Sequence, residues 1–164
     1  MKHFVLWKRT PILAMLALAL ATGLLAGCTG KEGGSGNLSA FEVGKRIELS
    51  ADLGNMKQGD AERLNKLYHL SSGDVADFVL YTASSNVKAD ELLIIQLKEG
   101  SEKEPVLAKI EERIAAQTVK FKDYRPEEYH LIEKCVLKTH GLFILFAVSP
   151  EAGAMERIFD ETFS

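Results

Sequence analysis

Cysteine is scarce in this chain, which limits its redox chemistry. Two cysteines are present in 164 residues, Cys28 and Cys135. If Cys28 is modified, as argued below, Cys135 has no partner and an internal disulfide is impossible. Cys135 lies in a strand-like run, without a preceding helix N-terminus that would activate its thiol. We therefore interpret Cys135 as a small buried strand residue, in preference to a nucleophile with His130 or His140 as its base.

Motifs of metal, nucleotide and hydrolase sites are also missing. His69, His130 and His140 are scattered, without the i,i+4 pairing or the Cys-x-x-Cys spacing of metal ligands. The chain has no G-x-S-x-G, no P-loop and no dinucleotide fingerprint. Ser84-Ser85 follows a candidate strand, but no glycine frames it, so a nucleophile elbow is not supported. We expect neither a metal nor a cofactor.

Long basic runs are absent, and acidic residues prevail. Without Lys2, Lys8 and Arg9, the chain from Cys28 onward has 17 basic and 23 acidic residues, a formal charge of −6. No run of five basic residues occurs, so we expect no nucleic-acid partner. Asp90 and Glu91 are adjacent carboxylates, but neighbours in a strand point to opposite faces and would not share a site.

The N-terminus has the pattern of a secretory signal. A basic segment, Met1–Thr10, precedes an apolar run, Ile12–Leu24. This run has about 13 residues, and a membrane span needs roughly 20. Leu25-Ala26-Gly27-Cys28 then resembles the lipobox of bacterial lipoproteins. The resemblance implies a diacylglyceryl group on the sulfur of Cys28 and cleavage of the chain just before it.

Three segments follow from this interpretation. Residues 1–27 are the signal peptide, residues 28–37 are the lipidated cysteine with a Gly/Ser-rich tether, and residues 38–164 form a single α+β domain. Stable anchoring needs two acyl chains, each buried CH₂ contributing about 0.8 kcal/mol. We expect the protein at the cell membrane, on the extracytoplasmic face, held through the lipid on Cys28.

The folded part has alternating helix and strand patterns. Helices are predicted over 39–49, 61–68, 105–122, 126 onward and 151–163, and strands over 75–83, 91–98, 134–139 and 142–148. Ser39 and Asp60 are the expected caps of the first two helices, and residues 51–59 read as a loop. The order α-α-β-β-α-α-β-β-α predicts an α+β domain with a four-stranded, mainly antiparallel sheet.

Two local patterns refine this expectation. His140-Gly141 is the expected two-residue turn between the last two strands. The helix over 105–122 has an apolar stripe that includes one polar residue: Leu107, Ile110, Ile114, Gln117 and Phe121. Its charged cluster Glu111-Glu112-Arg113 is expected on the solvated face.

The last strand is apolar on both faces. Phe143 and Leu145 belong to the row that helices on a single side of the sheet would leave uncovered. Exposing each would cost roughly 1.5–3 kcal/mol. Either the first or last helix covers this row, or a partner protein or a second copy of the chain does. Phe143 and Leu145 are therefore the candidate interaction face.

Four segments resemble one family of bacterial lipoproteins. They are "ADELLIIQLKEG", "VLAKIEERIAAQ", "YRPEEYHLIEKCVL" and "HGLFILFAVS". The chain is similar to the domain-of-unknown-function family 4358, found mainly in Firmicutes, over roughly Leu38 to Phe163. The family typically has Asn-Ala where this chain has Lys134-Cys135, which argues further against a nucleophilic Cys135. The resemblance implies a lipid-anchored extracytoplasmic domain and no assigned activity.

Two functions remain open at this point. The first is a non-enzymatic interaction or ligand-binding module, with an envelope protein as one possible partner. The second is a cell-envelope enzyme that uses carboxylate or Tyr residues in a cleft. Ionisable groups with displaced pKa values in a deep pocket would favour the enzyme, and a flat apolar patch would favour the interaction module.

Overall fold

A computed structural model of the chain describes residues 38–54 and 56–164. The signal segment, the lipobox residues Leu25, Ala26 and Gly27, Cys28 and the tether lie outside the described residues. Within the described part, no helix combines the length and the apolar character needed to cross a bilayer.

The described residues form an antiparallel sheet in the order β1-β2-β3-β5-β4. The strands are β1 (Met56–Gly59), β2 (Asp77–Ala83), β3 (Glu91–Gln96), β4 (Val136–His140) and β5 (Phe143–Val148). The α+β class is confirmed, but the predicted four-stranded sheet is wrong, because the structure adds β1. This strand lies in the segment expected to be a loop. It is a four-residue edge strand whose centre, Lys57-Gln58, is polar, so it has no apolar alternation to signal a strand.

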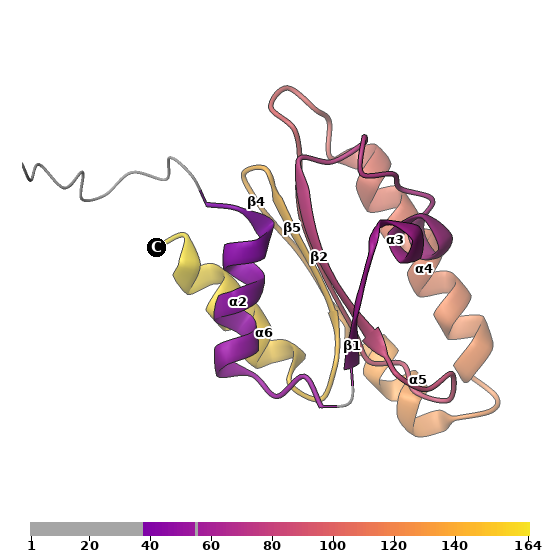
Figure 1. The fold of residues 1–164 in the computed structure, drawn as a ribbon. Helices are drawn as coiled ribbons and strands as arrows, with labels where there is room; N and C mark the ends of the chain where they lie inside the picture. The colour runs from indigo at the N-terminus through magenta and orange to yellow at the C-terminus, as the bar shows by residue number, and fades with distance from the viewer. Residues whose placement is uncertain (1–37, 55) are drawn as a thin grey trace, which may run out of the picture. The chain divides into compact units, whose positions relative to one another are not determined.

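Helices cover both faces of the sheet (Figure 1). The helices are α2 (Ala40–Ser50), α3 (Ala61–Tyr68), α4 (Glu104–Phe121), α5 (Pro126–Glu133) and α6 (Ala152–Thr162). The pair α2 and α6 packs on one face, and α3, α4 and α5 pack on the other. The two expected caps are confirmed: Ser39 forms a capping box with Glu42, and the Asp60 carboxylate accepts the Arg63 amide.

Strand alternation divides the hydrophobic core into two clusters. Leu93 and Ile95 face the layer of α3, α4 and α5, whereas Leu92 and Ile94 face α2 and α6. On β5, Leu145 is 0% exposed within the second cluster. The internal covering considered from the sequence is therefore the arrangement that the structure has.

The turn between β4 and β5 differs by one residue from the prediction. His140 pairs with Phe143 across the two strands, so the turn residues are Gly141 and Leu142. Gly141 has a φ of +54°, which glycine adopts without a Cβ clash. The His140 ring instead stacks on Phe163, with 4.4 Å between ring centroids.

Candidate functional site

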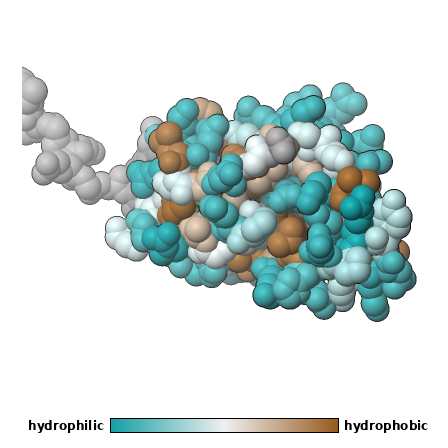
Figure 2. Space-filling model, turned by 90° about the horizontal axis from the view of Figure 1, so that it is seen from below, coloured by the Kyte–Doolittle hydropathy of each residue, from teal (hydrophilic) through white to brown (hydrophobic). Residues whose placement is uncertain are grey.

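Cavities meet at the connection between β2 and β3, residues 84–90. Three of them, with volumes of about 400, 720 and 320 Å³, are each lined by Ala83 and Ser84. Figure 2 shows this end of the domain, where hydrophilic side chains cover most of the view and hydrophobic ones form separate patches. The surface at this end therefore suits a polar ligand better than a broad apolar partner.

The smallest of the three, here called the basic cavity, lies between α3, α4 and the β2–β3 connection. Its charged lining residues are four cations and two carboxylates: Arg63, Lys88, Arg113, Lys120, Asp90 and Glu91. Neutral polar side chains complete much of the lining: Thr82, Ser84, Ser85, Asn86 and Gln117. Hydroxyl, amide and cationic donors thus surround a volume of about 320 Å³.

Glu91, at the start of β3, is a buried carboxylate held by three side chains. Tyr68 donates its hydroxyl to Oε1 at 2.5 Å, and Gln117 donates Nε2 to Oε2 at 3.2 Å. Arg113 donates Nη2 to Oε2 at 2.7 Å and points Nε at both oxygens. The Glu91 and Arg113 side chains are 1% and 17% exposed. We call Tyr68, Glu91, Arg113 and Gln117 the Glu91 network.

The electrostatics of the Glu91 network match this geometry. Burial raises the pKa of Tyr68 well above its usual value, and the negative charge of Glu91 raises it further. For Arg113, burial lowers the pKa, but the hydrogen bonds and charge of Glu91 outweigh burial and leave the pKa raised. The Tyr68 phenol is therefore neutral and the Arg113 guanidinium charged, and both are held at Glu91 by hydrogen bonds in the folded domain.

A second buried carboxylate fixes the β2–β3 connection. Glu128, in the first turn of α5, is 3% exposed. It accepts the Lys88 ammonium at 2.6 Å and the Ala89 amide at 2.9 Å. Hydrogen bonding to Glu128 raises the pKa of Lys88. One wall of the basic cavity is thus tied to α5 as well as to the sheet.

Two further titratable groups of the basic cavity have displaced pKa values. Burial lowers the pKa of Lys120, and the positive charge of Arg113 lowers it further, with Arg63 also contributing. Burial raises the pKa of Asp90, and the charge of Glu128 acts in the same direction. Asp90 and Glu91 line the same cavity, contrary to our expectation. Asp90 precedes β3, so strand alternation does not separate the two carboxyl groups.

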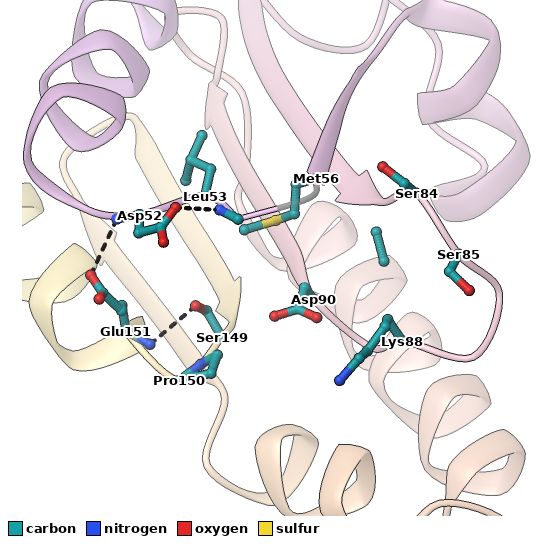
Figure 3. Close-up of a pocket in the computed structure, with 12 residues that line it drawn as sticks. Asp52, Leu53, Met56, Ser84, Ser85, Lys88, Asp90, Ser149, Pro150 and Glu151 are labelled. Atoms are coloured by element: carbon teal, nitrogen blue, oxygen red, sulfur yellow. Dashed lines mark hydrogen bonds between the residues drawn. The ribbon is translucent and has the colours of Figure 1, made fainter.

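On the other side of the connection lies the cavity of about 400 Å³ (Figure 3). Asp52 donates its amide to Glu151 at 3.3 Å and accepts the Gly54 amide at 2.7 Å. Ser149 accepts the Glu151 amide at 3.1 Å. These contacts join the loop after α2 to the start of α6. The charged residues that line this cavity are Asp52, Asp90, Glu151 and Lys88, so its lining is more acidic than that of the basic cavity.

Of the two residues proposed from the sequence as an interaction face, Leu145 lies in the core and Phe143 packs at its edge. Leu145 is fully buried. Phe143 is half-buried, and its ring packs on Phe163 with 5.0 Å between centroids. Cys28 and the lipobox, which carry the predicted anchor, lie outside the described residues.

The structure disfavours thiol chemistry at Cys135. The side chain is half-buried, and burial raises the pKa of its thiol, which lowers its nucleophilic fraction. His130 lies on α5, where it contacts Glu133 at 3.8 Å. Among the described residues, no group of three His, Cys, Asp or Glu side chains could hold a metal ion.

Sequence reasoning missed the Glu91 network. Arg113 was assigned to the solvated face of its helix, and this assignment is wrong, because Glu91 draws the guanidinium inward. The available signal was Gln117, a polar residue within the apolar stripe of α4. Since Gln117 is 4% exposed, it needed a buried partner.

The fold and the site together define an α+β domain with a cationic cavity at one end of an antiparallel sheet. The chain belongs to the family described as domain of unknown function, DUF4358, whose family model matches residues 49–149. The matched span includes every residue of the basic cavity and of the Glu91 network. Neither the curated proteins nor the solved structures that were searched include a match to this chain.

Proposed function

We propose that the protein is a membrane-anchored extracytoplasmic lipoprotein whose domain binds a ligand at the β2–β3 connection without transforming it. The observation that carries this proposal is the basic cavity, whose walls are held by two buried carboxylates, Glu91 and Glu128. Walls that are fixed by folding reduce the ordering cost of binding. The burial of Leu145 supports a ligand-binding site over an apolar docking face.

The anchor rests on the lipobox and is tested at Cys28. Mass spectrometry of the mature N-terminus should find a cysteine that carries the mass of a diacylglyceryl group. Cys28→Ala should abolish this mass and release the protein from the membrane fraction. Cys135→Ala is the matched control, since it removes the other cysteine and should leave anchoring unchanged. An N-terminus at Met1, or an unmodified Cys28, would contradict the proposal.

Ligand binding is tested by blocking the cavities from a surface position. Ser85 is exposed and lines both the basic cavity and the cavity of about 400 Å³. The full chain should melt at a higher temperature in a dialysable extract of the cell envelope, because ligand binding to the folded state stabilises it. Ser85→Trp should abolish the shift, and Ser101→Trp, in an exposed loop between β3 and α4, should preserve it. An equal shift in both variants would contradict a site at the connection.

One observation favours the alternative, an envelope enzyme. Asp90 lines two cavities, and burial raises the pKa of its carboxyl group. General acid–base hydrolysis by carboxylates uses two such groups in complementary roles. The neighbouring Glu91 is engaged by Arg113, Tyr68 and Gln117, so it acts in structure. The geometry therefore supports binding better than catalysis.

A further inference from the structure

Three cations from two helices line the basic cavity. Arg113 and Lys120 lie on α4 at positions i and i+7, which share one side of the helix. Arg63 reaches the same cavity from α3. Burial lowers the pKa of Lys120, and the positive charges of Arg113 and Arg63 lower it further.

The charges of the cavity do not all find a counterion within the protein. Glu91 pairs with Arg113, and Glu128 pairs with Lys88. Within residues 38–54 and 56–164, neither Arg63 nor Lys120 forms an ion pair. Asp90 is the remaining carboxyl group in the lining. Four cations against three carboxylates leave one positive charge in excess at this site. In a domain that is acidic overall, this excess favours an anionic ligand.

The donor arrangement suits a phosphate group. An arginine fork binds phosphate as well as carboxylate, and a lysine ammonium binds phosphate as a point charge. The fork of Arg113 is already engaged by the Glu91 carboxylate. The Lys120 ammonium of α4 and the Arg63 guanidinium of α3 remain for a ligand. Donors that converge from separate elements fit an acceptor whose oxygens point in several directions.

Building on the function proposed above, we infer that the basic cavity binds the phosphate group of its ligand, with Arg63 and Lys120 as the contacting cations and Arg113 as the fixed charge behind them. Two sources could present this group: a small phosphate ester, or the headgroup of an anionic phospholipid in the membrane to which the chain is anchored. The phosphate chemistry is the same for both sources, and the experiment below distinguishes them.

The binding test uses the full chain in nonionic detergent, titrated calorimetrically with inorganic phosphate and with sn-glycerol 3-phosphate. Both should bind, with acetate much weaker. Arg63→Gln and Lys120→Gln should each weaken binding by about tenfold or more, as expected for a charged hydrogen bond. Lys66→Gln is the matched control, because Lys66 is exposed on α3 and does not line the cavity. Asp90→Asn should strengthen binding, because it removes a negative charge from the lining. Circular dichroism checks that every variant is folded.

Two results would overturn the inference. One is no heat of binding up to about 10 mM phosphate. The other is an equal loss of phosphate affinity in Lys66→Gln and Lys120→Gln, which would show that binding depends only on the net charge of the domain. If phosphate fails while the thermal shift in envelope extract persists and remains sensitive to Ser85→Trp, the ligand-binding function stands and the ligand class is wrong.

The source of the phosphate is resolved in nanodiscs. Full chain in phosphatidylcholine discs should bind glycerol phosphate as it does in detergent. If the natural source is a lipid headgroup, adding phosphatidylglycerol to the discs should compete and weaken this binding, and Lys120→Gln should remove the competition. If the source is a small phosphate ester, binding should be the same in both kinds of disc. Loss of binding in both would contradict the inference for the anchored protein.

Discussion

Replacing Arg113 with methionine tests whether the Glu91 network stabilises the fold. Methionine preserves much of the aliphatic packing and removes the donors that reach Glu91. The Glu91 carboxylate is 1% exposed, so it would stay buried with the neutral donors Tyr68 and Gln117. Removing one partner of a buried ion pair costs about 3–5 kcal/mol. That is a large share of the roughly 5–15 kcal/mol that stabilises a domain.

Variants of the same network give a graded series. Gln117→Leu removes one neutral donor to a charged acceptor and should cost about 1.5–3 kcal/mol. The double variant Glu91→Leu, Arg113→Met replaces both charges with apolar groups, which is often close to neutral for a buried pair. The double variant should therefore be more stable than Arg113→Met alone.

The measurement is the free energy of unfolding in urea of residues 35–164, which form one compact unit. Circular dichroism monitors the unfolding. Arg125→Met is the control, since Arg125 is exposed and should change the free energy of unfolding by no more than about 0.5 kcal/mol. A loss below about 1 kcal/mol for Arg113→Met would refute the reasoning, because it falls under the range for a broken buried pair. A double variant that lost the sum of its two single losses would show that the two charges are not coupled.

Three further predictions concern the core and the network. Ile110→Ala should cost about 2–5 kcal/mol in a thermal melt, and Ile114→Ala less, because Ile110 is fully buried and Ile114 is not; equal losses would contradict this. The raised pKa of Tyr68 means that the folded state holds the phenol proton more tightly, so the stability it provides is intact below pH 10.0 and decreases as the pH rises above it. Tyr68→Phe should flatten that alkaline decrease, and an unchanged profile would argue against it. Phe143→Asp should lower the melting temperature because the ring packs on Phe163. If the variant instead folds normally but no longer cross-links to an envelope protein in cells, Phe143 belongs to an interaction face and this prediction is wrong.

The sequence predicted helices best where an N-cap residue precedes a run with helical spacing of apolar residues. Asp60 precedes a run with helical spacing, and the helix begins at Ala61 as predicted. In contrast, Lys57 and Gln58 have no apolar pattern. They form a strand because their backbone pairs with β2 at the edge of the sheet. That pairing depends on the tertiary fold and leaves no local trace. The turn was misplaced by one residue for a similar reason, since the pairing of His140 with Phe143 is decided across two strands.

The candidate site was the least predictable part. Arg113 follows two glutamates on a helix and looks like a solvent-facing residue until Glu91 is placed opposite it by β3. Glu128 has a favourable position in the first turn of α5, but nothing in its local sequence indicates that it accepts the Ala89 amide. The partners of these charges are 22 and 39 residues away. Charge pairing over such separations becomes visible only after the fold is known.

The placement of α6 has a consequence for how the chain is made. The apolar face formed by Leu92, Ile94 and Leu145 is covered by α2 from the first part of the domain and by α6 from its last residues. During synthesis from the N-terminus, half of this cover is therefore missing until α6 has emerged. The sheet cannot close its second core before then. A truncation before α6 would leave that face open, and such a product should be captured by chaperones or degraded by quality-control proteases.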